Sequence, residues 1–228
     1  MTDNDEKEIC RQLWETASTF VKSMGRREHV FEPAPDRSAL VVVDMQNFVC
    51  SPRNGKGFPG LEQVISRVNS LADFCHDRKI PVIWLRQNFT RINGKDDSGL
   101  YPAFHVSPML QGMFNQARDT EIFSGMHVDP ALDRVVLKNR YSAFAPGSSC
   151  LGSLLTQMNK NQLLLCGLAT NVCLESTARD AMQHGYEVIV AGDAAASFNE
   201  LLHAASLATI KLFFGDVRNT GDILKLWG

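Results

Sequence analysis

The feature that most constrains the fold is a regular alternation between short apolar runs and longer segments with one apolar face. Runs of Val, Leu and Ile are typical of strands that are covered on both faces of a sheet. The chain has five of them: Leu40–Val43, Pro81–Leu85, Val135–Leu137, Leu163–Cys166 and Val188–Val190. Helical spacing of apolar residues marks the segments between them: Val64–Cys75, Ser149–Asn159, Asn171–His184 and Leu201–Phe214. This alternation predicts right-handed crossovers and a mainly parallel sheet between helix layers, which is a three-layer α/β/α sandwich.

The N-terminal segment has a helical pattern of its own. Apolar residues recur at helical spacing from Glu6 to Met24, and the prolines of Glu32–Pro35 then interrupt the chain. We therefore expect residues 1–35 to form a helical arm and linker ahead of one α/β domain, residues 36–228. Because a long exposed apolar stripe is a liability on a monomer, we predict that the arm packs on a neighbouring subunit of a homo-oligomer, a dimer or tetramer. The alternative is that the arm packs on its own domain.

Composition and charge exclude several classes of protein. A chain of 228 residues with a net charge of −2 has the size of one domain and no basic excess for binding nucleic acid. The N-terminal residues are acidic and polar, and no apolar run approaches the ~18 residues of a membrane span. The six scattered cysteines are typical of reduced thiols. We therefore expect a cytoplasmic protein that binds neither membranes nor nucleic acid.

Three residues that can carry chemistry follow strands of the predicted sheet, and ligands bind at the carboxyl ends of parallel strands. Asp44 follows the first strand and Lys138 the third, although each alone could be a cap or a lysine that reaches for water. Cys173 falls in the first turn of the helix that follows the fourth strand. A helix N-terminus lowers the pKa of a thiol, and its free amides can bind an oxyanion. Other cysteines are interpreted as buried hydrophobic residues: Cys10, Cys75 and Cys166.

Together these residues predict nucleophilic catalysis. Asp44 takes the proton of the Cys173 thiol and later returns it to the leaving group. Lys138 lies between the acid and the thiolate and orients the acid. Amides of the turn Gly167–Cys173 stabilise a tetrahedral oxyanion.

Other motifs do not predict a cofactor or a metal. Gly55–Gly60 matches the dinucleotide-binding fingerprint, but no strand directly precedes it, so we interpret it as a loop. The six histidines contain no HExxH pattern, and no cysteine pair has metal-ligand spacing. The long segment Asn88–Val128 is expected to cover the substrate.

Three stretches resemble the family of cysteine hydrolases related to isochorismatase and nicotinamidase. They are Val41–Asn47, Lys138–Phe144 and Gly167–Ala181, within a resemblance that extends from Ser38 to Val217. The resemblance implies a six-stranded parallel sheet and a catalytic triad of Asp, Lys and Cys. The matching residues are Asp44, Lys138 and Cys173. It also implies a cis peptide between Leu168 and Ala169, with an oxyanion hole from the amides of Ala169 and Cys173.

The resemblance is to the metal-free branch that acts on ureidoacrylate and N-carbamoyl amides. Nicotinamidases bind a metal through an Asp-x-His pattern and a further His, whereas His76 is the only histidine between Asp44 and Asn88. The segments Arg140–Ser142 and Phe213–Val217 are similar to the ureidoacrylate branch. The substrate contacts that we predict are Gln46, Gln87, Asn88, Tyr141 and Phe144.

We therefore expect an enzyme that cleaves a C–N bond of a small linear amide, ureido or carbamoyl compound through a thioester acyl-enzyme. One alternative is a vinyl-ether hydrolase of the isochorismatase type, in which Asp44 acts as the acid and no acyl-enzyme forms. The other is a flavodoxin-like binding or thiol-redox module that is not an enzyme. A redox role requires a resolving cysteine, and Cys166 is close to Cys173 in the sequence.

Overall fold

The computed structural model describes residues 2–51, 58–88, 101–104 and 118–227. A six-stranded sheet in the order β3-β2-β1-β4-β5-β6 forms its centre, and all neighbouring strands are parallel. The strands are β1 Ser38–Val43, β2 Val82–Gln87, β3 Arg134–Lys138, β4 Gln162–Leu168, β5 Glu187–Ala196 and β6 Asp216–Arg218. The five predicted strands are confirmed, and β6 is the short last strand.

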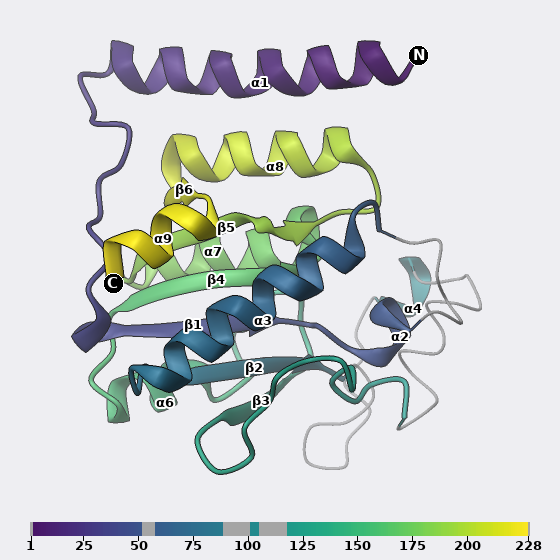
Figure 1. Cartoon of the computed structure of the whole chain (residues 1–228), viewed down its shortest axis with the longest axis vertical. Coiled ribbons are helices and arrows are strands. Elements are labelled where there is room, and N and C mark those ends of the chain that lie inside the picture. Colours follow the sequence, from purple (N-terminus) through teal and green to yellow (C-terminus); the bar gives the residue numbers. More distant parts are fainter. Residues whose placement is uncertain (1, 52–57, 89–100, 105–117, 228) are drawn as a thin grey trace.

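Helices cover both faces of the sheet, which confirms the predicted three-layer sandwich (Figure 1). The helices are α1 Asp3–Ser23, α2 Asn47–Cys50, α3 Leu61–Asp77, α4 Tyr101–Phe104, α6 Leu151–Gln157, α7 Glu175–Gln183, α8 Glu200–Phe213 and α9 Thr220–Trp227. Successive side chains of a strand point to opposite faces. Leu40 and Val42 of β1 therefore pack with α3 and α9, whereas Val41 and Val43 pack with α6, α7 and α8.

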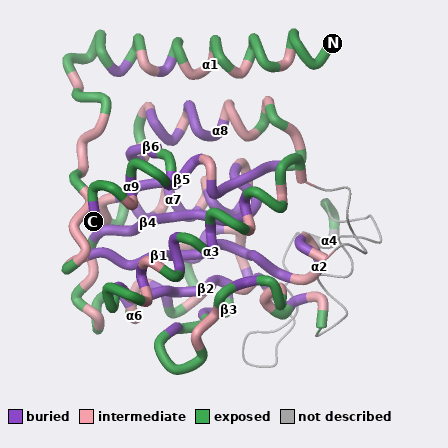
Figure 2. Tube along the Cα trace, in the orientation of Figure 1, coloured by how far each residue is buried: buried purple, intermediate pink, exposed green. Residues whose placement is uncertain are grey.

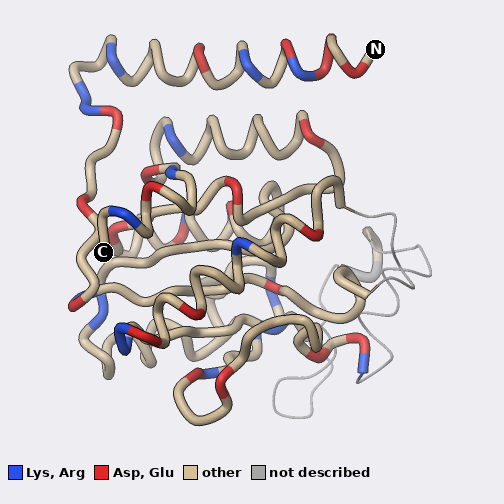
Figure 3. Tube along the Cα trace, viewed as in Figure 1, with Lys and Arg blue, Asp and Glu red and all other residues tan. Residues whose placement is uncertain are grey.

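Burial follows this layering. The strands are buried along almost their whole length, except at β3, which lies at one edge (Figure 2). Helix α9 was not foreseen from the sequence, and its Ile223 and Trp227 complete the core beneath α3. Charged residues of both signs are interspersed along the described chain (Figure 3), in keeping with the net charge of −2.

Helix α1 confirms the predicted helical arm but lies along α8 of the same chain (Figure 1). The rings of Phe20 and Phe213 are 6.2 Å apart, and the Lys211 ammonium lies 4.1 Å from the ring centre of Trp14. Arg26 donates hydrogen bonds to the carbonyl oxygens of Lys211 and Leu212, which lie in the last turn of α8. Within one chain the structure therefore supports the alternative, in which the arm packs on its own domain, because periodicity reveals an apolar face but not the surface that covers it. The homo-oligomer stays a prediction, without the arm as its support.

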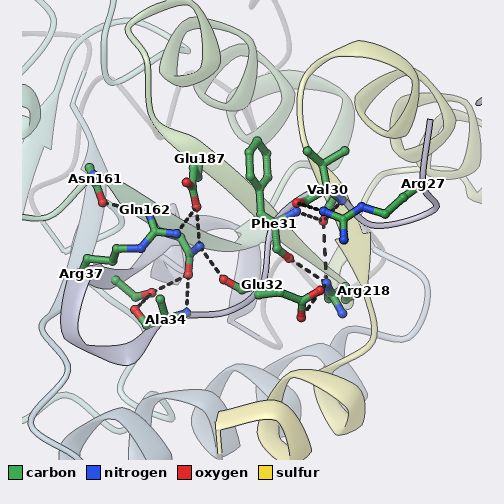
Figure 4. A network of polar contacts seen from close by, with 12 residues as sticks. Arg27, Val30, Phe31, Glu32, Ala34, Arg37, Asn161, Gln162, Glu187 and Arg218 are labelled. Atoms are coloured by element: carbon green, nitrogen blue, oxygen red, sulfur yellow. Dashed lines mark hydrogen bonds and ion pairs between the residues drawn. The ribbon is translucent and has the colours of Figure 1, made fainter. Parts of the chain in front are cut away.

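The linker after α1 is fixed to the amino ends of the strands (Figure 4). The buried carboxylate of Asp216 accepts hydrogen bonds from the backbone amides of Val30 and Phe31, with distances of 2.8 to 2.9 Å. The amide of Ala34 donates to the Gln162 side chain over 2.7 Å. The linker therefore belongs to the packed surface of the domain.

The six cysteines are all free, as predicted. Within the described ranges, every helix is either too short or too polar to cross a lipid bilayer.

Candidate active site

The carboxyl ends of β1, β3 and β4 bring together the three residues of the predicted triad. Nζ of Lys138 lies 2.8 Å from Oδ2 of Asp44. The thiol of Cys173 interacts with both side chains. All three residues are buried, with exposed fractions of 4% for Asp44, 0% for Lys138 and 7% for Cys173. An acid, a cation and a thiol thus share one site that is largely withdrawn from water.

Gly167 allows β4 to approach β1 at this point. It pairs with Val43, the residue before Asp44, and its φ is +104°. A Cβ atom at Gly167 would lie 2.2 Å from the Val43 carbonyl oxygen, so only glycine fits. Asp44 itself has a φ of +49°, a left-handed conformation that non-glycine residues rarely adopt outside functional or turn positions.

The turn that carries Cys173 differs from the expected α-helical turn. The cis peptide between Leu168 and Ala169 is present, and residues Thr170–Leu174 then form a π-helical turn ahead of α7. The amides of Val172 and Leu174 both donate to the carbonyl of Ala169, over 3.1 and 3.2 Å. Donors for an oxyanion must therefore come from the other amides of the turn. Those of Ala169 and Cys173 are among them, and their role stays a prediction.

Lys138 is held by three acceptors. Besides Asp44, its ammonium group donates to Oε1 of Gln87 and, over 3.2 Å, to the carbonyl oxygen of Arg140. The Cys173 thiol also interacts with this ammonium group, which has three N–H donors, so all of its donors have partners within reach. The lysine is thus fixed in place as a buried cation instead of reaching for water.

Burial sets the protonation states of the site. It raises the pKa of the Asp44 carboxyl, and Lys138 opposes this effect. Burial alone would lower the pKa of Lys138, but the neighbouring Asp44 and Cys173 raise it above its ordinary value. Burial and the Asp44 carboxylate raise the pKa of the Cys173 thiol. The direction is the opposite of the lowered thiol pKa that the sequence predicts, and burial is its largest cause. The nucleophile rests as a neutral thiol and requires a base.

Two of the predicted substrate contacts have partners within the protein, and their contact with substrate stays a prediction. The buried Gln46 side chain donates to the carbonyls of Gln87 and Thr120 and accepts from the Gln87 amide, so it joins β2 to the segment after it. The Gln87 side chain holds Lys138. The register of β2 and β3 explains this role, because it places Gln87 opposite Lys138.

Phe144 lies away from the triad. Its ring packs on His184 and Tyr186, with centroid distances of 5.7 and 5.2 Å. Tyr186 directly precedes β5, so it lies at the amino ends of the parallel strands. The triad lies at their carboxyl ends. The structure therefore assigns Phe144 to packing. Asn88 and Tyr141 are half-buried near the triad strands, and their contact with substrate stays a prediction.

The predicted loop Asn88–Val128 falls largely outside the described residues, as does most of Gly55–Gly60. Over the described ranges, no three His, Cys, Asp or Glu side chains are grouped as metal ligands. His76 hydrogen-bonds to the buried Asp133 over 2.8 Å. That the chemistry needs no metal stays a prediction.

Cys166 and Cys173 pack on opposite faces of the sheet. Cys166 belongs to the core beneath α3, whereas Cys173 belongs to the core beneath α6, α7 and α8. Cys166 is therefore not placed to resolve a disulfide with Cys173. This observation removes the support for a thiol-redox module.

Comparisons with known proteins agree with this geometry. Residues 38–222 match the Isochorismatase domain family. The chain is 33% identical over 220 residues to the ureidoacrylate amidohydrolase RutB of Methylobacterium radiotolerans, covering 86% of this chain and 84% of that protein. It is 30% identical over 196 residues to nicotinamidase 3 of Arabidopsis thaliana, covering 80% and 85%.

Two further comparisons extend this picture. Enterobactin synthase component B of Escherichia coli is 30% identical over 190 residues, which are 83% of this chain and 63% of that protein. A cysteine hydrolase from Pseudomonas syringae pv. phaseolicola has a TM-score of 0.77 and 26% identity, over 87% of this chain and 95% of that one.

Proposed function

Because the chain belongs to the isochorismatase family of hydrolases, we propose that it cleaves a C–N bond of a small linear amide, ureido or carbamoyl compound. The observation that carries the proposal is a neutral, buried thiol that faces a lysine-bound carboxylate. Such a thiol becomes a nucleophile when an adjacent base removes its proton. A ureidoacrylate amidohydrolase and a nicotinamidase among the relatives support the amide as substrate.

Acylation begins at the thiol. The Asp44 carboxylate removes the Sγ proton of Cys173 as sulfur attacks the carbonyl carbon of the substrate, and the C=O electron pair moves onto oxygen. Amides of the turn Ala169–Cys173 stabilise this oxyanion. When the oxyanion collapses, the C–N bond breaks, and Asp44 gives its proton to the leaving nitrogen. The product of this half-reaction is an amine or ammonia and a thioester on Cys173.

Deacylation uses the same groups. Asp44 takes a proton from water as the water oxygen attacks the thioester, and the sulfur of Cys173 leaves and recovers that proton. Lys138 has two roles in this scheme. It fixes Oδ2 of Asp44 over 2.8 Å, and its charge stabilises the transient thiolate.

A specific observation also favours the second candidate, a vinyl-ether hydrolase. Burial raises the pKa of Asp44, which suits a general acid, and the family model that matches is that of the Isochorismatase domain. This reaction requires Asp44 to be protonated and does not require Cys173. The two candidates therefore differ in their dependence on the thiol.

A substrate panel tests the proposal. Ammonia release is measured on linear amides, ureido and carbamoyl compounds, with wild type, Cys173→Ser and Cys150→Ser. Cys150 is exposed, so its variant controls for the loss of a thiol as such. We expect turnover by wild type and by Cys150→Ser, and none by Cys173→Ser. Ammonia release that survives in Cys173→Ser contradicts the covalent mechanism, and a panel on which wild type releases no ammonia contradicts the proposed amide hydrolysis.

A further inference from the structure

Helix α8 packs against the π-helical turn Thr170–Leu174 that carries Cys173. The Thr170 hydroxyl lies 2.8 Å from Nδ1 of His203, in the first turn of α8. The Ser206 hydroxyl, one turn later, donates to the carbonyl oxygen of Thr170 over 3.0 Å. Thr170 is fully buried. Two side chains of α8 thus hydrogen-bond to Thr170, one to its side chain and one to its backbone.

The next residue of the turn is held as well. The Ser197 hydroxyl donates to Oδ1 of Asn171 over 2.5 Å. Ser197 directly follows β5, and Asn199 caps α8 by accepting from the amides of Leu201 and Leu202. The hydrogen bonds to the turn therefore come from residues at or near the capped N-terminus of α8.

His203 contacts both this turn and a cavity. It lines a space of about 410 Å³ between α3 and α8, together with Gln63, Arg67 and Glu200. Burial lowers the pKa of His203, so the ring is neutral near neutral pH. A neutral ring that carries its proton on Nε2 can accept a hydrogen bond from the Thr170 hydroxyl at Nδ1.

We propose that His203 is a positioning residue for the amide-hydrolysing reaction: through the Thr170 hydroxyl, it fixes the turn Ala169–Cys173 so that its amides converge on the developing oxyanion. The inference rests on the proposed function. It adds a residue on α8 that acts through Thr170. A small misplacement of oxyanion donors costs rate because they act only when aligned with the transition state.

Two probes of Cys173 separate this role from general packing. Attack of the thiol on p-nitrophenyl acetate forms an oxyanion, transfers the acetyl group to sulfur and releases p-nitrophenol. Alkylation by iodoacetamide displaces iodide at a saturated carbon and forms no oxyanion. Both reactions need the thiolate. The ratio of their rates at Cys173, followed by peptide mass spectrometry, therefore reports the oxyanion site alone.

The variants remove or restore one hydrogen bond. Thr170→Val and His203→Leu lose it, whereas Thr170→Ser and His203→Asn keep a polar atom in place. Gln63→Ala alters the same cavity without touching the turn. We expect acylation to fall ~10-fold in the first pair, well below the cost of losing an oxyanion donor altogether, and alkylation to change by less than ~2-fold. The second pair and Gln63→Ala should stay near wild type.

The double variant Thr170→Val/His203→Leu should be no slower than the slower single variant, because both remove one interaction. A ratio of acylation to alkylation rates that stays unchanged in Thr170→Val and His203→Leu, including the case in which both rates fall equally, overturns the proposal. If His203→Leu does not fold, the Thr170 pair decides alone. Failure of the proposed function is a separate result, since wild type would then hydrolyse no amide while the two probes still report on Cys173.

Discussion

Replacing Gly167 by alanine should separate β4 from β1 at the active site. The new Cβ would lie 2.2 Å from the carbonyl oxygen of Val43 and 2.8 Å from its amide nitrogen. Both atoms are backbone, so rotating a side chain cannot relieve the contact. The left-handed conformation costs an L-residue ~1–2 kcal/mol, and overpacking a buried site costs ~1–3 kcal/mol more. The sum of ~2–5 kcal/mol is a large part of a stability of ~5–15 kcal/mol.

Gly185→Ala is the matched control. Gly185 also has a positive φ, +87°, but a Cβ there meets nothing within 4 Å. It therefore measures the backbone cost alone. In urea unfolding followed by tryptophan fluorescence, Gly167→Ala should lose ~1–3 kcal/mol more than Gly185→Ala, with activity lost as well. Equal losses in the two variants would refute the argument that close strand approach at Gly167 fixes Asp44 beside the turn.

Three further predictions concern the triad and the arm. Gln87→Leu leaves a buried N–H of Lys138 without its acceptor, so the free energy of unfolding should fall by ~1–3 kcal/mol. The kcat should fall by a larger factor than KM rises, and an unchanged kcat would show that Gln87 does not position the lysine. Amide hydrolysis should rise with pH as Asp44 loses its proton, with a midpoint above the ordinary carboxyl pKa of ~4, because burial raises the pKa of Asp44. A rate of amide hydrolysis that falls through that midpoint would contradict the role of Asp44 as the base. Deleting residues 1–24 should destabilise the protein, since Trp14 and its neighbours cover α8. At ~25 cal/mol for each Å² of apolar surface that the deletion exposes, the loss amounts to several kcal/mol. An unchanged temperature of thermal unfolding would contradict this packing.

Local pattern predicts much of the fold and the identity of the triad. Continuous apolar runs mark buried parallel strands whatever their neighbours are, and parallel strands end at a common edge. This is why Asp44, Lys138 and Cys173 could be assigned to one site before the structure.

Contacts between distant segments could not be predicted in this way. The periodicity of α1 shows an apolar face but not that α8 covers it. Gln87 has the polarity of a substrate ligand, and its register with Lys138 alone assigns it to the lysine. The pKa of Cys173 depends on its burial in the folded core and on the neighbouring Asp44, which no local motif contains.

The most direct test of the covalent mechanism is intact-protein mass spectrometry of wild type during turnover of a slow amide substrate, quenched in acid. A thioester predicts a mass increase equal to the acyl group, which peptide mapping locates on Cys173 and which hydroxylamine removes. Cys173→Ala should show no increase and no turnover. Turnover by wild type without an adduct under any quench, combined with full activity of Cys173→Ala, would contradict the account.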